Sequence, residues 1–195
     1  MRCPCLSSVI VVALMLGSTF GCSRSQQAPA PTAGASGASG ATASDSAVRT
    51  PSPAQQAFMD RLTVRHHFDP ATGFIVADET TPLPAVLRDA EPLEAAADTA
   101  RREGRTLIAF TTADRCAPCQ QFKKDALNDP RVVAFLSSGK VLAVHVEVDR
   151  EGESAQRVLG STAIPASHAL RPDGRIERLP GMRSADALLA WMQQF

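Results

Sequence analysis

The chain has 195 residues, and its 20 acidic and 20 basic side chains cancel to a formal net charge of zero. That length suits one domain of ordinary size with some chain left over. The balanced charge gives no indication of nucleic acid as a partner. Because tyrosine is absent and Trp191 is the single tryptophan, we do not expect an aromatic ligand-binding platform.

The N-terminus has the pattern of an export signal. Arg2 provides a basic start, Leu6 to Leu16 is almost entirely apolar, and small residues follow up to Gly21. Such a run is too short for a transmembrane helix and is typical of a signal peptide, which we assign to residues 1–21. A buried N-terminal helix is the alternative.

Cys22 follows this signal directly. Gly21-Cys22 resembles the bacterial lipoprotein box, in which the cysteine becomes the lipidated first residue of the mature protein. Thr19 and Phe20 differ from the residues usual in that box, so ordinary signal cleavage remains the alternative. The resemblance implies that Cys22 is a lipid anchor on the periplasmic side of a bacterial membrane, whereas ordinary cleavage implies a soluble periplasmic protein.

Two segments separate the signal from the main domain. Residues 22–53 are rich in Ala, Gly, Ser, Thr, Pro and Gln, and they cannot bury enough apolar surface to offset the entropy of ordering. We expect a disordered tether there. Residues 54–90 combine helical spacing over Ala54–Leu62 with two short strand patterns, Thr63–Phe68 and Gly73–Val76, around a turn. They predict a small N-terminal extension that contains a hairpin.

The main domain, residues 91–195, alternates helical and strand patterns and ends in a hairpin. The expected elements are a helix from 91 to 103, a strand at 105–111, a helix at 120–127, a helix from 130, a strand at 140–149, a helix at 154–159, strands at 167–170 and 175–179, and a helix after Ser184. This order implies a mixed sheet with helices on both faces.

Cys116-Ala117-Pro118-Cys119 places two thiols three positions apart, between a buried strand and a helix. The N–H groups and dipole at such a junction favour a thiolate over a thiol at Cys116. Cys119 lies one turn further along and is placed to attack a mixed disulfide on Cys116. Pro118 suits the first helical turn, where a backbone N–H has no helical partner.

The pair is isolated among the five cysteines of the chain. Export removes Cys3 and Cys5, and acylation of Cys22 leaves Cys116 and Cys119 as the free thiols. A permanent disulfide is the alternative, but a loop this short is a poor staple. The pattern favours a redox-active dithiol.

Leu107 to Cys119 (LIAFTTADRCAPC) resembles the strand and active-site segment of the thioredoxin family. Ile164-Pro165 is similar in place to the cis-proline of that family, and Gly181 resembles a glycine that follows its second hairpin strand. Thr112 to Pro130 resembles the C-terminal domain of DsbD-type disulfide reductases and small exported thioredoxin-like proteins. The resemblance covers about Glu91 to Phe195 and implies the α/β thioredoxin fold, with a mixed central sheet and flanking helices.

The resemblance implies a thiol–disulfide oxidoreductase in which Cys116 is the nucleophile and Cys119 the resolving thiol. It also implies that Ile164 and Pro165 guide the extended backbone of a protein substrate. The two residues between the cysteines tune the redox potential in this family, which makes Pro118 a candidate for tuning. We expect protein thiols and disulfides as partners, an unidentified redox donor or acceptor, no cofactor and a monomer.

Two positions depart from the family pattern. Arg115 stands where the family usually has tryptophan, and its guanidinium is a candidate for stabilising the Cys116 thiolate, with Asp114 opposing it. Phe110 stands where the family often has a buried acid, which is thought to take the proton from the second cysteine. The DsbD-type resemblance favours a reductase, whereas the missing acid favours an oxidase or a partner-specific exchanger, so the redox direction stays open.

Two other functions remain as alternatives. A metal-binding or metallochaperone domain would hold Cu(I) or Zn(II) with the two thiols and a histidine, for which His168 and His145 are the candidates. The pair His66-His67 lies in the extension. A thioredoxin-fold interaction module on a tether would use the fold without depending on the redox chemistry.

Overall fold

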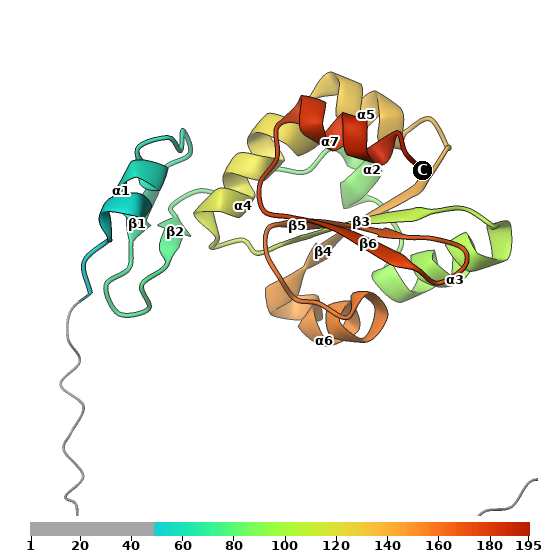
Figure 1. Ribbon diagram of the computed structural model, residues 1–195, viewed down its shortest axis with the longest axis horizontal. Helices are drawn as coiled ribbons and strands as arrows, with labels where there is room; N and C mark the ends of the chain where they lie inside the picture. Colours follow the sequence, from blue (N-terminus) through green and yellow to red (C-terminus); the bar gives the residue numbers. More distant parts are fainter. Residues whose placement is uncertain (1–48) are drawn as a thin grey trace, which may run out of the picture. The chain divides into compact units, whose positions relative to one another are not determined.

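The computed structural model describes residues 49–195 (Figure 1). The expected export signal, Cys22 and most of the expected tether lie outside the described residues. Within residues 49–195, no helix has both the length and the apolar character needed to cross a membrane.

A mixed four-stranded sheet forms the centre of the fold, in the order β4-β3-β5-β6 (Figure 1). The strands are β3 (Leu107–Thr112), β4 (Leu142–Glu147), β5 (Ala166–Leu170) and β6 (Ile176–Pro180). β3 runs parallel to β4 and antiparallel to β5, and β5 pairs antiparallel with β6. All six side chains of β3 are buried, as a strand covered on both faces requires. The expected mixed sheet with a terminal hairpin is confirmed.

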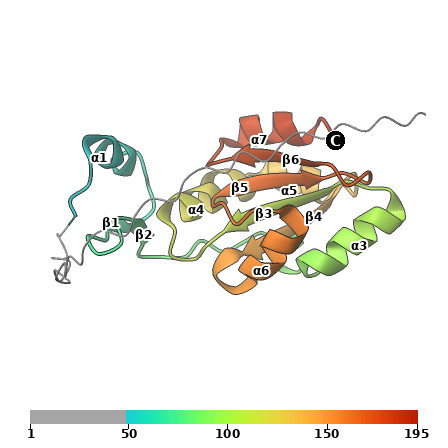
Figure 2. The same cartoon turned by 60° about the horizontal axis from the view of Figure 1, so that its bottom comes forward.

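Helices cover both faces of this sheet (Figures 1 and 2). The helices on one face are α3 (Leu93–Glu103) and α6 (Val148–Leu159), and those on the other are α2 (Ala85–Arg88), α4 (Ala117–Phe122), α5 (Pro130–Leu136) and α7 (Ala185–Met192). Leu107 and Val144 point toward α3 and α6, because they pack in one cluster with Leu93 and Leu159. Phe110 packs on the opposite face, together with Phe122 of α4.

The helix after the CxxC motif begins earlier and ends differently than expected. α4 starts at Ala117 rather than Gln120, with Cys116 as its N-cap. The expected run to Leu127 is helical, but its second half, Lys123–Leu127, is a π-helical turn, η1. Such turns interrupt the α-helical hydrogen-bond pattern and often occur at functional sites. This one buries the side chain of Lys123, which is 2% exposed.

The boundary between β4 and α6 was misplaced by the strand pattern. β4 ends at Glu147 and α6 begins at Val148, whereas the sequence indicated a strand to Asp149 and a helix from Ser154. Valines at alternate positions continue through Val148, so the period of a strand persists after the strand has ended.

The N-terminal extension forms a helix and a hairpin, both shorter than expected. α1 (Pro53–Met59) is fixed by a capping box between Ser52 and Gln55 and ends before Leu62. β1 (His66–Phe68) pairs antiparallel with β2 (Ile75–Ala77). The short helix α2 was not expected, because four residues are too few to show a helical period.

Candidate active site

Cys116 and Cys119 form a disulfide at the end of β3. After Thr112 the chain turns tightly, and the Cys116 N–H donates to the Ala113 carbonyl at 3.2 Å. Cys116 then caps α4, because the Cys119 N–H lies 3.2 Å from the Cys116 sulfur. Pro118 occupies the first turn, where its missing N–H leaves no helical hydrogen bond unmade.

The two sulfurs differ in accessibility. Cys116 is partly exposed, whereas Cys119 is completely buried. An attacking thiolate must reach a partner disulfide, and a resolving thiol needs only to reach its neighbour. The difference in burial therefore fits the roles that were predicted for Cys116 and Cys119.

The Ile164–Pro165 peptide bond is cis, as expected from the sequence. The loop is held to the central strand, because the Thr111 hydroxyl donates to the Ala163 carbonyl at 2.7 Å. Gly181, with a positive φ of 78°, donates its N–H to the Pro165 carbonyl at 2.9 Å. Ile164 is 39% exposed, so this loop presents an accessible apolar side chain. Its role in guiding a substrate stays a prediction.

The N-terminal hairpin contacts the dithiol, a contact that the sequence did not predict. Val76 of β2 forms an antiparallel β-bridge with Cys116. The Ala77 N–H donates to the Arg115 carbonyl at 2.9 Å. The segment just before the motif is thereby paired on one edge. The Arg115 side chain is exposed, and its predicted influence on the thiolate stays a prediction.

Two buried glutamines directly after Cys119 attach the extension to α4. The Gln121 side-chain oxygen accepts from the N–H groups of Thr63 and Val64, at 2.6 and 3.1 Å. The Gln120 side-chain oxygen accepts from the Thr81 N–H at 2.6 Å, and its nitrogen donates to the Asp114 carbonyl at 2.8 Å. Polar residues at buried helix positions were the available signal, but their partners lie far away in the sequence.

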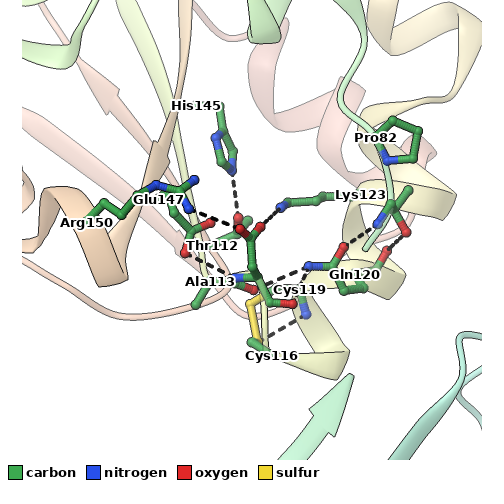
Figure 3. Close-up of polar contacts among 12 residues, drawn as sticks. Pro82, Thr112, Ala113, Cys116, Cys119, Gln120, Lys123, His145, Glu147 and Arg150 are labelled. Atoms are coloured by element: carbon green, nitrogen blue, oxygen red, sulfur yellow. Dashed lines mark hydrogen bonds and ion pairs between the residues drawn. A yellow bond between two sulfur atoms is a disulfide. The ribbon is translucent and has the colours of Figure 1, made fainter. Parts of the chain in front are cut away.

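A cluster of charged side chains lies beside the dithiol (Figure 3). The Asp114 carboxylate is within 3.3 Å of the Lys123 ammonium and 3.2 Å of the Arg150 guanidinium. The Asp114 N–H donates to Oε1 of Glu147 at 3.0 Å. His145 Nε2 lies 2.7 Å from the Thr112 hydroxyl. Sequence reasoning missed this cluster, apart from the separate mention of Asp114 and His145.

Burial and charge shift the pKa values of this cluster in different directions. Burial, assisted by the charge of Lys123, lowers the pKa of His145 to about 4, so its imidazole is neutral near pH 7. Burial, assisted by the charge of Asp114, raises the pKa of Glu147. Burial also acts against ionisation of Asp114, but the hydrogen bonds and charges of Lys123 and Arg150 outweigh it and lower its pKa.

Of the two histidines predicted as candidate metal ligands, His145 belongs to this cluster, and the other, His168, lies on β5. His168 is completely buried, and its Nε2 is 3.3 Å from the Thr111 hydroxyl. His66 Nδ1 lies 2.7 Å from the Val64 carbonyl, and His67 Nδ1 lies 2.6 Å from Asp78. Across residues 49–195, no three His, Cys, Asp or Glu side chains gather in an arrangement that would hold a metal ion.

The mixed sheet, the disulfide at the start of a helix and the cis-proline loop together define a dithiol protein of α/β architecture. A family model described as a thioredoxin-like domain matches residues 93–195. The chain belongs to this family. No curated protein sequence matches the chain.

Several solved structures are similar to the chain. A thioredoxin from Thermus thermophilus is 29% identical, with 53% of this chain and 82% of that chain covered and a TM-score of 0.45. The oxidised C-terminal domain of Neisseria meningitidis DsbD is 27% identical, with 52% and 91% covered and a TM-score of 0.43. A DsbH oxidoreductase is 13% identical, with 59% and 85% covered and a TM-score of 0.47.

A CxxC disulfide in a thioredoxin-like domain indicates thiol–disulfide exchange, and the fold implies protein thiols and disulfides as partners. Both the family match and the geometry of the site support this assignment.

Proposed function

We propose that this protein is an exported, membrane-tethered thiol–disulfide oxidoreductase that acts on protein partners through Cys116 and Cys119. The observation that carries the proposal is the pairing of a partly exposed sulfur at a helix N-cap with a completely buried sulfur one turn along. Such a pair separates the attacking thiol from the resolving thiol.

The exchange proceeds in two steps. The Cys116 thiolate attacks a partner disulfide, a mixed disulfide forms, and one partner thiolate leaves. Cys119 then loses its proton and attacks the Cys116 sulfur, which closes the Cys116–Cys119 disulfide and releases the second partner thiolate. The partner gains two electrons, and the dithiol loses two. Run in reverse, the same steps oxidise a partner dithiol.

We favour the reductase direction, because the stretch from Thr112 to Pro130 resembles DsbD-type reductases. A reductase in an oxidising compartment needs an electron donor, which regenerates the dithiol after each turnover. The cis-proline loop supports docking of an extended protein segment, since Ile164 is exposed there and the loop is tied to β3 through Thr111.

Trapping of mixed disulfides tests the exchange chemistry. In Cys119→Ala the resolving thiol is missing, so partners should accumulate on Cys116 when cells are quenched with acid and alkylated. The matched control, Cys116→Ala, should trap none. If Cys119→Ala traps nothing, and the purified protein instead binds one Cu(I) or Zn(II) tightly, the exchange function is wrong and the metal-binding function replaces it.

Membrane attachment has its own test. The N-terminal pattern up to Gly21-Cys22 supports export and lipidation at Cys22. Fractionation of cells should find the protein with the membranes, and Cys22→Ala should move it to the soluble exported fraction. Unchanged partitioning of Cys22→Ala would remove the lipid anchor from the proposal and leave the dithiol chemistry untouched.

A further inference from the structure

The resolving step needs a base for a thiol that is shielded from bulk solvent. Cys119 is completely buried in the described structure, yet it must lose a proton before it attacks the Cys116 sulfur. Phe110 of the neighbouring strand is also completely buried and packs against Phe122, with ring centroids 6.3 Å apart. A phenyl ring accepts no proton, so the base must come from another element.

Glu147 lies on the sheet face that α4 covers. In the parallel pairing of β3 with β4, Phe110 is opposite His145, and Thr112 is opposite Glu147. Paired residues of adjacent strands share a face, and residues two apart along a strand share it too. Glu147 is therefore on the same face as Phe110, one step closer to the loop that carries the dithiol.

The Glu147 carboxyl is attached to that loop. Its Oε1 accepts from the Asp114 N–H at 3.0 Å. The Asp114 carbonyl in turn accepts from the side chain of Gln120, the residue after Cys119. Figure 3 shows Glu147, Ala113 and the disulfide around this one turn. A change of charge on Glu147 thus occurs beside the backbone that positions both sulfurs.

One oxygen of Glu147 is not used by the fold. The residue is only 2% exposed, and its Oε2 has no hydrogen-bond partner among residues 49–195. Buried polar atoms without partners are uncommon in native proteins and often have a chemical role. A group kept only for structure would be expected to satisfy both oxygens or to be an amide.

A cavity of about 610 Å³ lies next to this carboxyl, and Glu147 is among its lining residues. Its wall also includes the exposed side chains of Arg88, Glu91 and Arg150, so solvent has access to it. Polar cavities of this size hold water, and water carries protons between groups that do not touch. The cavity gives a buried carboxyl a route for proton exchange with solvent.

We propose that Glu147, on β4, is the group that exchanges protons with the dithiol. It takes the place of the acid that is missing at Phe110. This inference rests on the proposed exchange function. As Cys119 attacks Cys116, its proton passes through water to the Glu147 carboxylate and then through the cavity to solvent. In the reverse direction the protonated carboxyl returns a proton to the Cys119 thiolate that leaves.

The surroundings of Glu147 support a carboxyl that changes its protonation state. The titratable and charged groups that face it are Asp114 after β3, Lys123 of η1, His145 of β4, Arg150 and Glu151 of α6, and Arg88 and Glu91 on the cavity wall. Burial and the Asp114 charge raise the pKa of Glu147, which moves its proton affinity toward that of a thiol.

The test separates the two steps of exchange with the chromogenic aromatic disulfide dithiobis(nitrobenzoate). The full chain carries Cys3→Ser, Cys5→Ser and Cys22→Ser, so that only the CxxC thiols react. Attack by Cys116 on the reagent releases the first coloured thiolate, and resolution by Cys119 releases the second. Stopped-flow absorbance across a range of pH values gives both rates.

Glu147→Gln keeps the size and the acceptor for the Asp114 N–H, and it removes the titrating group. We expect the second phase to slow by about tenfold or more near pH 7, with the first phase unchanged. Its rate should then rise about tenfold per pH unit, as for an unassisted thiol. The wild-type second phase should show a shallower dependence with an added carboxyl inflection.

Two further variants distinguish a proton-exchanging role from a structural one. Glu147→Asp retains a carboxyl and should restore part of the wild-type pH profile. Glu153→Gln removes an exposed acid of α6 that does not line the cavity, and it should leave both phases unchanged. Equal second phases in wild type and Glu147→Gln would overturn the proposal. Equal slowing by Glu147→Asp and Glu147→Gln, or slowing by Glu153→Gln, would overturn it too. Loss of the first phase in the wild type would instead refute the proposed exchange function.

Discussion

Two sets of buried polar groups lie beside the dithiol, and they differ in how completely they are hydrogen-bonded. In both Gln120 and Gln121 the side-chain oxygen and the side-chain nitrogen are hydrogen-bonded. These bonds join α4 to the extension and to the turn before Cys116. Glu147 uses one oxygen and leaves the other without a partner within the described residues. The comparison separates polar groups that hold the site together from a polar group that is available for chemistry.

Physical arguments support this distinction. A buried amide with all its partners contributes to a unique packing, because removal of one partner leaves the other group desolvated and unpaired. A buried carboxyl with a free oxygen lowers stability and is retained where its protonation is useful. The following variants test this distinction, in order of decreasing effect.

Gln121→Ala removes a polar group that holds the site together and should have the largest effect. It leaves the buried N–H groups of Thr63 and Val64 without their acceptor, at a cost of about 3 kcal/mol in unfolding free energy. Urea denaturation followed by circular dichroism measures this loss. Gln56→Ala, at an exposed position of α1, is the matched control and should change stability by less than about 0.5 kcal/mol. Equal losses would contradict the structural role.

Acid should destabilise the fold through its buried histidines. Burial first, and then the charge of Arg178, lowers the pKa of His168 to about 4, compared with 6.5 when the chain is unfolded. Between these values only the unfolded state takes up the proton, so stability falls as the pH decreases from 6.5 toward 4. We expect a loss of about 2 kcal/mol from His168 between pH 7 and pH 4.5. The difference in unfolding free energy between wild type and His168→Gln, measured by denaturation, should therefore shrink at the lower pH.

Glu147→Gln tests the polar group that is available for chemistry, because it should slow the resolving step and also stabilise the fold. A raised pKa in the folded state means that stability is lost as the pH rises through that pKa, and an amide does not ionise. We expect a gain of about 1 kcal/mol near pH 8 and less near pH 4. A gain that is independent of pH would show that the effect comes from packing rather than from the charge.

Arg150→Ala should have the smallest effect. Its side chain is 68% exposed and, among residues 49–195, forms one ion pair, with Asp114. Exposed pairs of this kind contribute within about 0.5 kcal/mol, and salt screens them. Thermal denaturation at low and high salt should show a small difference that disappears at high salt. A larger loss would place Arg150 in the structural set.

The sequence predicted well the parts of the fold that depend on residues close together in the chain. The β3 strand, the CxxC junction, the terminal hairpin and the cis bond at Pro165 have local patterns, and the structure contains them. The errors at Val148 and α2 also have a local origin, since alternating valines imitate a strand and a four-residue helix shows no period.

The candidate site was predictable only in part. The spacing of Cys116 and Cys119 indicates a reactive pair in the sequence. His145 and His168 were predicted as candidates because imidazole can bind metal ions. The bridge from Val76 to Cys116 and the bonds of Gln121 join positions far apart in the chain, so no periodic pattern indicates them. The importance of Glu147 depends on which sheet face it occupies and on an unpaired oxygen, and both require coordinates.

The hydrogen bonds of Gln121 have a consequence for the design of a minimal redox fragment. The family match begins at residue 93, but the groups that satisfy this buried amide belong to Thr63 and Val64. A fragment cut at the start of the match would lose these partners and would also expose Ala117, which packs with Leu62 and Val64. The smallest unit that keeps the dithiol helix intact therefore includes the hairpin, and the extension is part of the redox module itself.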